Sequence, residues 1–263
     1  MVVRRPSFDT LDREKTTYFL ASGGRDSTAF VLEAHRLGIK GELVYGDTRL
    51  NRSDAIKVLK RLAKYTGYKL NIVRYEGTEK PIRILKQSFK NLPKAIAFKK
   101  KTGVFRRNMF SCCSTLKHKP MDAFFSQLDK DSIQLVIGMK AGDGALHRRY
   151  RLRQLREKET FYRTLKANGL TYFYPLRDCF GSDIDLILSE YGFDGIHGSG
   201  CTICPIFLMF EGIKKKDPAT YRRSLQFAKS LNIEIDATLQ TDLREHCIDR
   251  ETDEIMAIEK ELA

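Results

Sequence analysis

The first 75 residues alternate short apolar runs with amphipathic helical patterns, and this alternation is the feature that most constrains the fold. Residues 17–21, 41–45 and 69–73 are predicted strands. Helical periodicity predicts helices over 29–37 and 53–65, each followed within two residues by a glycine that suits a helix C-terminus. A β-α-β-α-β order requires parallel strands with crossover helices on the faces of the sheet.

The same pattern continues for about another hundred residues. Residues 132–138 and 170–174 predict two more strands, with a helix over 121–128 before the first of them. We therefore expect an α/β fold, a doubly wound parallel sheet, as one nucleotide-binding domain over residues 1–178. Residues 179–263 should form a cysteine-containing, mostly helical region packed on it. The helices expected there are residues 183–191, 206–213, 219–231 and 243–262.

Charge is distributed unevenly along the chain, whose net charge is +14. Residues 80–121 contain twelve Lys and Arg and no acidic residue, whereas residues 232–263 contain ten acidic and three basic residues. A basic body suits a polyanion such as a nucleic acid or a nucleotide, although a solvated Lys-rich surface is the alternative. Aromatic residues interleave with cations near Lys94–Arg107, so this segment is the candidate contact for tRNA or DNA.

The apolar segments are too short for a membrane protein. No apolar run approaches the roughly 20 residues that a membrane-spanning helix needs, and the N-terminus lacks the apolar stretch of a secretion signal. We therefore expect a cytoplasmic protein with no membrane partner. In that compartment its six cysteines should be thiols or metal ligands rather than disulfides.

A glycine-rich loop joins the first predicted strand to the first predicted helix. Its glycines allow backbone N–H groups to approach phosphate oxygens, and its three hydroxyl side chains add donors. Asp26 could bind Mg²⁺ or cap the helix, and an ordinary turn with an Asp N-cap is the structural alternative. The spacings of a Walker A loop and of a dinucleotide fingerprint are both absent. The loop residues are Ser22, Gly23, Gly24, Arg25, Asp26, Ser27 and Thr28.

Four of the six cysteines form two close pairs, Cys112-Cys113 and Cys201-Thr-Ile-Cys204. Two such pairs supply the four thiolates of one metal site. Adjacent cysteines strain a single tetrahedral zinc ion, whereas separate iron corners of a cluster accept them. The residues alone leave a [4Fe–4S] cluster and zinc open, with a vicinal disulfide or unrelated buried thiols as further alternatives.

These motifs carry a family resemblance. The loop resembles the pyrophosphate loop (PP-loop) of the N-type ATP pyrophosphatases, the adenine nucleotide alpha-hydrolase-like superfamily. Asp47-Thr48 resembles its phosphoadenosine phosphosulfate (PAPS) reductase family, and the cysteine spacing resembles the [4Fe–4S] pattern of adenylyl-sulfate reductases. The resemblance implies ATP and Mg²⁺ as cofactors, with Asp47 and Gly138 joining the loop in nucleotide binding. It also favours a [4Fe–4S] cluster over zinc at the four cysteines.

Further blocks follow in the order found in that family. Gly138-Met-Lys140 with Arg148-Arg149 resembles the Gly-x-Arg-x-x-Glu-Ser-x-x-Arg segment that lines the nucleotide site, and Cys112-Cys113 is followed by a Lys and Pro segment as in the family. The residues that the resemblance implies for catalysis are Asp26, Lys117, Lys140, Arg148 and Arg149.

Two departures separate the chain from sulfonucleotide reductases. Those enzymes carry a catalytic cysteine in a C-terminal Glu-Cys-Gly-Leu-His, whereas the tail here reads Glu245-His-Cys247-Ile-Asp. They also often have a degenerate phosphate loop, and this one is complete. We therefore expect an ATP-pyrophosphatase-type enzyme that adenylates a substrate for iron–sulfur-dependent sulfur transfer to a nucleic acid or nucleotide, with the sulfur donor unspecified. The alternatives are a sulfonucleotide reductase and a non-catalytic nucleotide- and metal-binding subunit.

Overall fold

The computed structural model describes residues 3–9, 11–102, 110–140, 169–196, 200–209 and 217–235. The chain divides into two compact units that are interleaved along the sequence, whereas the sequence suggested one boundary after residue 178. The first unit comprises Met1–Asp47, Asn51–Arg74 and Lys119–Gly200. The second comprises Thr48–Leu50, Tyr75–His118 and Cys201–Ala263.

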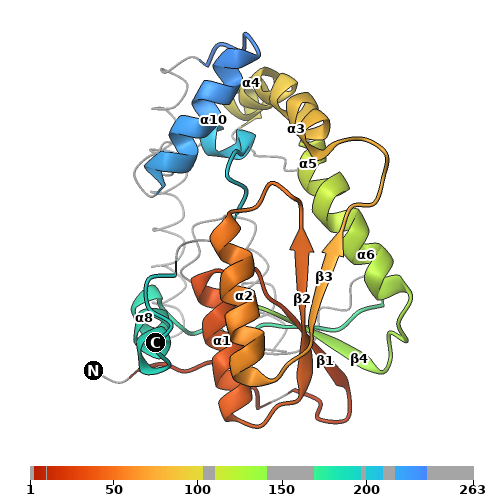
Figure 1. Ribbon diagram of the computed structural model, residues 1–263, viewed down its shortest axis with the longest axis vertical. Helices are drawn as coiled ribbons and strands as arrows, with labels where there is room; N and C mark the ends of the chain where they lie inside the picture. The colour runs from red at the N-terminus through yellow and green to blue at the C-terminus, as the bar shows by residue number, and fades with distance from the viewer. Residues whose placement is uncertain are drawn as a thin grey trace. The chain divides into compact units, whose positions relative to one another are not determined.

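The described strands of the first unit form one five-stranded parallel sheet in the order β3-β2-β1-β4-β5 (Figure 1). β1 pairs with β2 on one side and with β4 on the other, so the direction of winding reverses at β1. This order confirms the expected doubly wound α/β fold. The strands are β1 (Thr16–Leu20), β2 (Gly41–Asp47), β3 (Leu70–Arg74), β4 (Ile133–Ile137) and β5 (Tyr172–Phe173).

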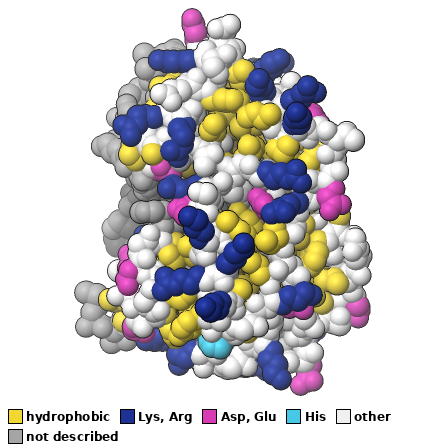
Figure 2. Space-filling view, viewed as in Figure 1, with side chains coloured by type: hydrophobic (Ala, Val, Ile, Leu, Met, Phe, Trp, Pro, Cys, Tyr) yellow, Lys and Arg dark blue, Asp and Glu magenta, His cyan; other side chains and the backbone are white. Residues whose placement is uncertain are grey.

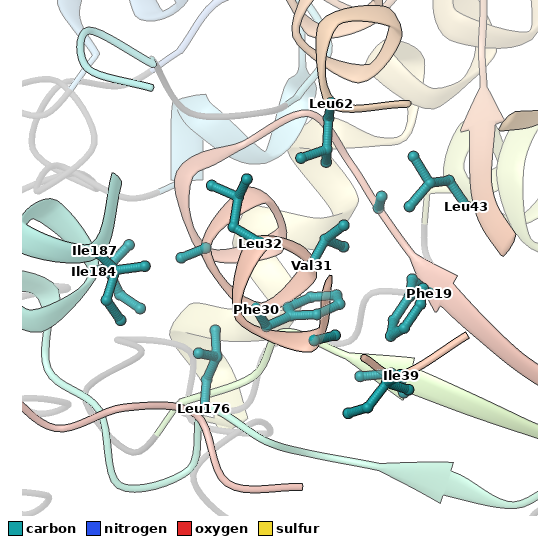
Figure 3. Packing of buried hydrophobic residues seen from close by; sticks show 14 of the residues in the cluster. Phe19, Phe30, Val31, Leu32, Ile39, Leu43, Leu62, Leu176, Ile184 and Ile187 are labelled. Carbon is teal, nitrogen blue, oxygen red and sulfur yellow. The ribbon is translucent and has the colours of Figure 1, made fainter. Parts of the chain in front are cut away.

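Helices cover both faces of this sheet. They are α1 (Arg25–Arg36), α2 (Ser53–Thr66), α6 (Lys119–Ser126) and α8 (Gly181–Glu190). Successive strand side chains point to opposite faces, so neighbouring residues of β1 enter different cores. Phe19 packs in a buried cluster with Phe30 of α1 and Leu62 of α2, to which α8 also contributes (Figure 3). Tyr18 packs on the other face with Phe125 of α6.

The second unit is helical in its described residues and has an apolar cluster of its own. Phe89 and Tyr221 lie in that cluster, and Cys112 lies beside them. The sequence did not predict α3 or α4, and the helix expected over 206–213 is a 3₁₀ helix in its described part. The expected helix over 243–262 lies outside the described residues. The elements are α3 (Pro81–Lys90), α4 (Leu92–Thr102), α5 (Ser111–Cys113), a π-helical turn (Ser114–His118), the 3₁₀ helix (Pro205–Met209) and α10 (Pro218–Ser230).

A membrane-spanning helix needs about 20 predominantly apolar residues. Across the described ranges, no helix combines the length and the apolar character needed to cross a bilayer.

A buried carboxylate links α1 to the N-terminal segment and to the residue after α8. Glu33 is fully buried and accepts hydrogen bonds from Arg5 at 2.7 Å and from the Tyr191 hydroxyl at 2.9 Å. Arg36 adds a further ion pair to Glu33 at 2.9 Å. Burial and the bond to Glu33 raise the pKa of Tyr191 to about 12. Arg5 also pairs with the exposed Glu190 at 2.6 Å, so one guanidinium joins a buried and an exposed carboxylate.

We expect Glu33→Ala to lower the free energy of unfolding by about 3 kcal/mol, because it removes the buried acceptor of several charge-assisted hydrogen bonds. Glu190→Ala is the matched control and should cost about 0.5 kcal/mol, since exposed ion pairs contribute little. Chemical denaturation of the full-length protein measures both. Equal losses would show that burial does not decide the contribution of this network.

Candidate functional site

The glycine-rich loop follows β1, at the point where the strand order reverses. Doubly wound sheets bind ligands in the crevice at this point, because the connections on either side of the strand run to opposite faces. The loop enters α1 through Gly24, whose extended backbone immediately precedes the helix. The first turn of a helix presents N–H groups that have no partner within the helix, which suits an anion.

Hydroxyl groups in the loop fix its shape. The Ser27 and Thr28 hydroxyls donate to the Gly24 carbonyl at 3.0 and 2.9 Å. The Ser22 N–H donates to the Ser27 hydroxyl oxygen at 3.1 Å. These side chains were expected to offer donors to a phosphate, and in the structure they bind the loop backbone itself. The loop is therefore held in one conformation by its own residues.

Two glycines allow the chain to approach its neighbours closely around this loop. Gly23 has φ +73°, and a Cβ there would lie 2.4 Å from the Ala55 carbonyl oxygen of α2. At Gly138, just after β4, a Cβ would lie 2.8 Å from the Phe30 ring of α1. Any side chain at either position would push α2 or α1 away from the loop. The family resemblance named both glycines, and the structure gives a steric reason for each.

An ion pair bridges the loop and the segment after β4. Lys140 Nζ lies 2.6 Å from Asp26 Oδ2, with side chains 13% and 30% exposed. A second ion pair joins the ends of β2 and β3, where Arg74 Nε lies 2.8 Å from Asp47 Oδ2. The carboxyl ends of parallel strands share one edge of the sheet, so both pairs belong to the edge where ligands bind. The sequence predicted Asp26, Lys140 and Asp47 for this edge, but not Arg74.

Asp26 and Asp47 are the candidate carboxylates for Mg²⁺ at this edge. In the part of the chain that the structure describes, no group of three or more His, Cys, Asp and Glu side chains could hold a metal ion. Asp26 and Asp47 each face a cation instead. Mg²⁺ in nucleotide sites takes one or two carboxylates and completes its shell with phosphate oxygens and water. Either carboxylate therefore fits Mg²⁺ only together with a bound nucleotide.

The four paired cysteines all belong to the second unit and are free thiols. A hydrogen bond to Cys113 and burial raise the pKa of Cys112, and the nearby Cys204 contributes in the same direction. Burial, with Cys201 and Cys113 nearby, raises the pKa of Cys204 to about 12. The thiols therefore lie within electrostatic reach of one another. Four such thiols have the donor chemistry of a thiolate-bound metal group, although among the described residues they do not form a site for a single metal ion as they stand.

Hydroxyl side chains from distant segments support these cysteines, and the sequence did not reveal them. The Cys112 N–H donates to Ser88 of α3 at 2.9 Å, and the Cys204 N–H donates to Ser224 of α10 at 3.0 Å. Thr48, which follows β2, contacts the Cys201 sulfur at 3.6 Å. Single serines 20 or more residues away carry no recognisable motif, so only the fold brings them to the cysteines.

The remaining candidate residues are placed less completely. Lys117 is half-buried in the π-helical turn of the second unit, so the two catalytic lysines expected from the sequence belong to different units. Arg148 and Arg149 lie outside the described residues. The candidate nucleic-acid segment Lys94–Arg107 is described only as far as residue 102. The roles of these residues remain predictions.

No family model matches the chain. A curated relative, the uncharacterized protein MJ0973 of Methanocaldococcus jannaschii, is 26% identical over 230 residues, which are 83% of this chain and 49% of the relative. The chain thus spans about half the length of that relative.

Solved structures with a similar fold include a PAPS reductase from Candida auris, at 12% identity and a TM-score of 0.45 over 72% of this chain and 76% of that one. The U34-tRNA thiolase NcsA from Methanococcus maripaludis, solved with its [4Fe–4S] cluster, has 15% identity and a TM-score of 0.41 over 86% and 74%. The first of these two structures is a PAPS reductase, the family that the motifs resemble. Likeness at this level does not assign an activity.

We expect Gly23→Ala to lower the free energy of unfolding by about 3 kcal/mol and to abolish nucleotide binding, because it adds a clash with α2 to the strain of a positive φ. Gly38→Ala is the matched control: Gly38 has φ +67° but no atom within 4 Å of the added Cβ. It should cost about 1 kcal/mol and leave binding unchanged. Urea denaturation and ATP titration distinguish the two, and equal effects would contradict the steric role of Gly23.

Proposed function

We propose that the chain is an ATP-pyrophosphatase-type enzyme that adenylates a substrate so that sulfur can replace an oxygen of a nucleic acid or nucleotide. The observation that carries the proposal is the complete glycine-rich loop at the strand-order reversal, with Asp26 and Lys140 paired across it at 2.6 Å. The loop offers backbone donors for phosphates, and the pair places a carboxylate and a cation beside them.

The reaction that such a site supports begins at the α-phosphate of ATP. An acceptor oxygen attacks that phosphorus, the bond to the β,γ-phosphates breaks, and pyrophosphate leaves. The acceptor then carries AMP, a good leaving group, which a sulfur nucleophile displaces. Lys140 would exchange Asp26 for the phosphates as its ion-pair partner when they bind. Arg74 beside Asp47 would add positive charge at the same edge.

Two bound groups would complete this chemistry. Mg²⁺, held by Asp26 or Asp47 together with phosphate oxygens, would neutralise charge on the departing pyrophosphate. A [4Fe–4S] cluster held by Cys112, Cys113, Cys201 and Cys204 would supply iron, and an iron that gives up its thiolate ligand could carry the sulfur. The fit of the cluster rests on the donor set, since four neighbouring thiols in one unit match its ligand requirement.

We expect Asp26→Asn to slow ATP-dependent pyrophosphate release at least 100-fold, because it removes the charge that positions Lys140 and Mg²⁺. Glu42→Gln is the control: Glu42 pairs with Lys69 at 3.5 Å near the amino end of β2, at the opposite edge of the sheet. Its activity should stay within twofold of the natural protein. Release of sulfite from adenylyl sulfate without ATP, at a rate that Asp26→Asn does not change, would favour the reductase instead.

We expect protein purified without oxygen to contain iron and acid-labile sulfide, and Cys112→Ala or Cys204→Ala to lose both. Cys179→Ala is the matched control, because Cys179 is also buried, with a pKa raised to about 12 chiefly by burial, but belongs to the first unit. It should keep its iron. Zinc without sulfide in the natural protein would contradict the cluster.

A further inference from the structure

The second unit contains a cavity of about 600 Å³ beside α3. One wall is the face of α3 that carries Arg83, Lys86 and Lys90. Ser111 and Thr115 line it from the segment that holds Cys112, and Leu231 lines it from the end of α10. Hydroxyl and cationic side chains therefore surround this space, and all of its described lining residues belong to the second unit.

The cations of this wall lie on one side of the helix. Arg83, Lys86 and Lys90 are three and four residues apart, the spacing that aligns side chains along one face. All three are exposed, and among the described carboxylates none forms an ion pair with them. Glu79, just before α3, is the carboxylate among the described lining residues. Lys and Arg side chains also gather over the region of α3 and α4 in Figure 2.

The length of this row fits a chain of phosphates better than a single one. Seven residues of helix separate Arg83 from Lys90, a rise of about 10 Å. Successive phosphates of one strand in duplex DNA are about 3.4 Å apart along the helix axis, so the row spans about three of them. The hydroxyls of Ser111 and Thr115 would add neutral donors to phosphate or sugar oxygens, as nucleic-acid contacts commonly do.

Hydrogen bonds connect the lining of the cavity to the first cysteine pair. Ser88 of α3 forms a hydrogen bond with Ser111 at 3.2 Å and accepts the Cys112 N–H at 2.9 Å. The wall that carries the cations is thus fixed to the first cysteine pair. A polymer lying along α3 would therefore bind to the helix that also holds the Cys112 backbone.

We infer that the cavity and the cationic face of α3 bind the sugar-phosphate backbone of a nucleic acid beside the cysteine pairs. This deepens the proposed function by giving the acceptor a position in the second unit. It differs from the segment Lys94–Arg107 that the sequence suggested, because it rests on described side chains of α3 and on the cavity that they line. The interaction itself requires neither ATP nor a metal.

The test measures binding of fluorescent bulk tRNA and of a single-stranded DNA 20-mer by the full-length protein without ATP. Lys86→Gln with Lys90→Gln should weaken binding at least tenfold at 0.1 M salt. It should also reduce the slope of log affinity against log salt by about 1.5, since each lost phosphate contact contributes about 0.7 to 0.9. Tighter binding of one probe identifies the nucleic acid, and either preference supports the inference.

The matched control is Arg222→Gln with Lys229→Gln, which removes the same charge from exposed positions of α10 in the same unit. It should change binding less than twofold. Equal losses in the two double variants, no loss in either, or no binding of either probe would overturn the inference. Asp26→Asn should bind both probes like the natural protein, so a failure of the proposed ATP chemistry leaves this result standing.

Discussion

The position of β1 between β2 and β4 is the constraint on which the first unit depends. Both neighbours are parallel to β1, so each must be reached by a crossover connection. Because the neighbours lie on opposite sides of β1, these connections run along opposite faces of the sheet. The loop that remains at this end has little room, with α2 touching Gly23 and α1 touching Gly138. Close packing here fixes the loop, and the loop in turn fixes the backbone N–H groups that we propose bind phosphate.

The ion pair between Asp26 and Lys140 is physically suited to exchange partners. The Asp26 side chain is 30% exposed and that of Lys140 13%, so both groups keep some contact with water. In the proposed function, phosphate oxygens would replace Asp26 as the partner of Lys140, and Asp26 would become available to a cation that arrives with the nucleotide. Glu33 differs, because its carboxylate is fully buried and would be left as an unsatisfied buried charge if its arginines moved away.

The sequence predicted the sheet and its loop well, because hydrophobic periodicity and the glycines between elements are local signals. Strand β1 was expected one residue later than it lies, and α1 four residues later, since the polar first turn from Arg25 hides the start of the helix. Helices α3 and α4 were not predicted, because their many Lys and Arg residues led us to interpret the segment as a basic contact surface and not as helices. The partners Ser88, Ser224 and Arg74 were beyond prediction, since each contact joins residues far apart in the chain.

The thiols of the second unit have raised pKa values, and these bear on the metal group that we propose for them. Burial and mutual proximity hold the pKa of Cys204 near 12 in the folded chain, against 9.0 for an unperturbed thiol. The protonated thiols therefore support folding below about pH 9, and that support is lost as the pH rises toward 12. At neutral pH four thiolates would repel one another in a poorly solvated place. The proposed metal group would reverse this balance, because its positive charge would stabilise the thiolates that the protein alone disfavours.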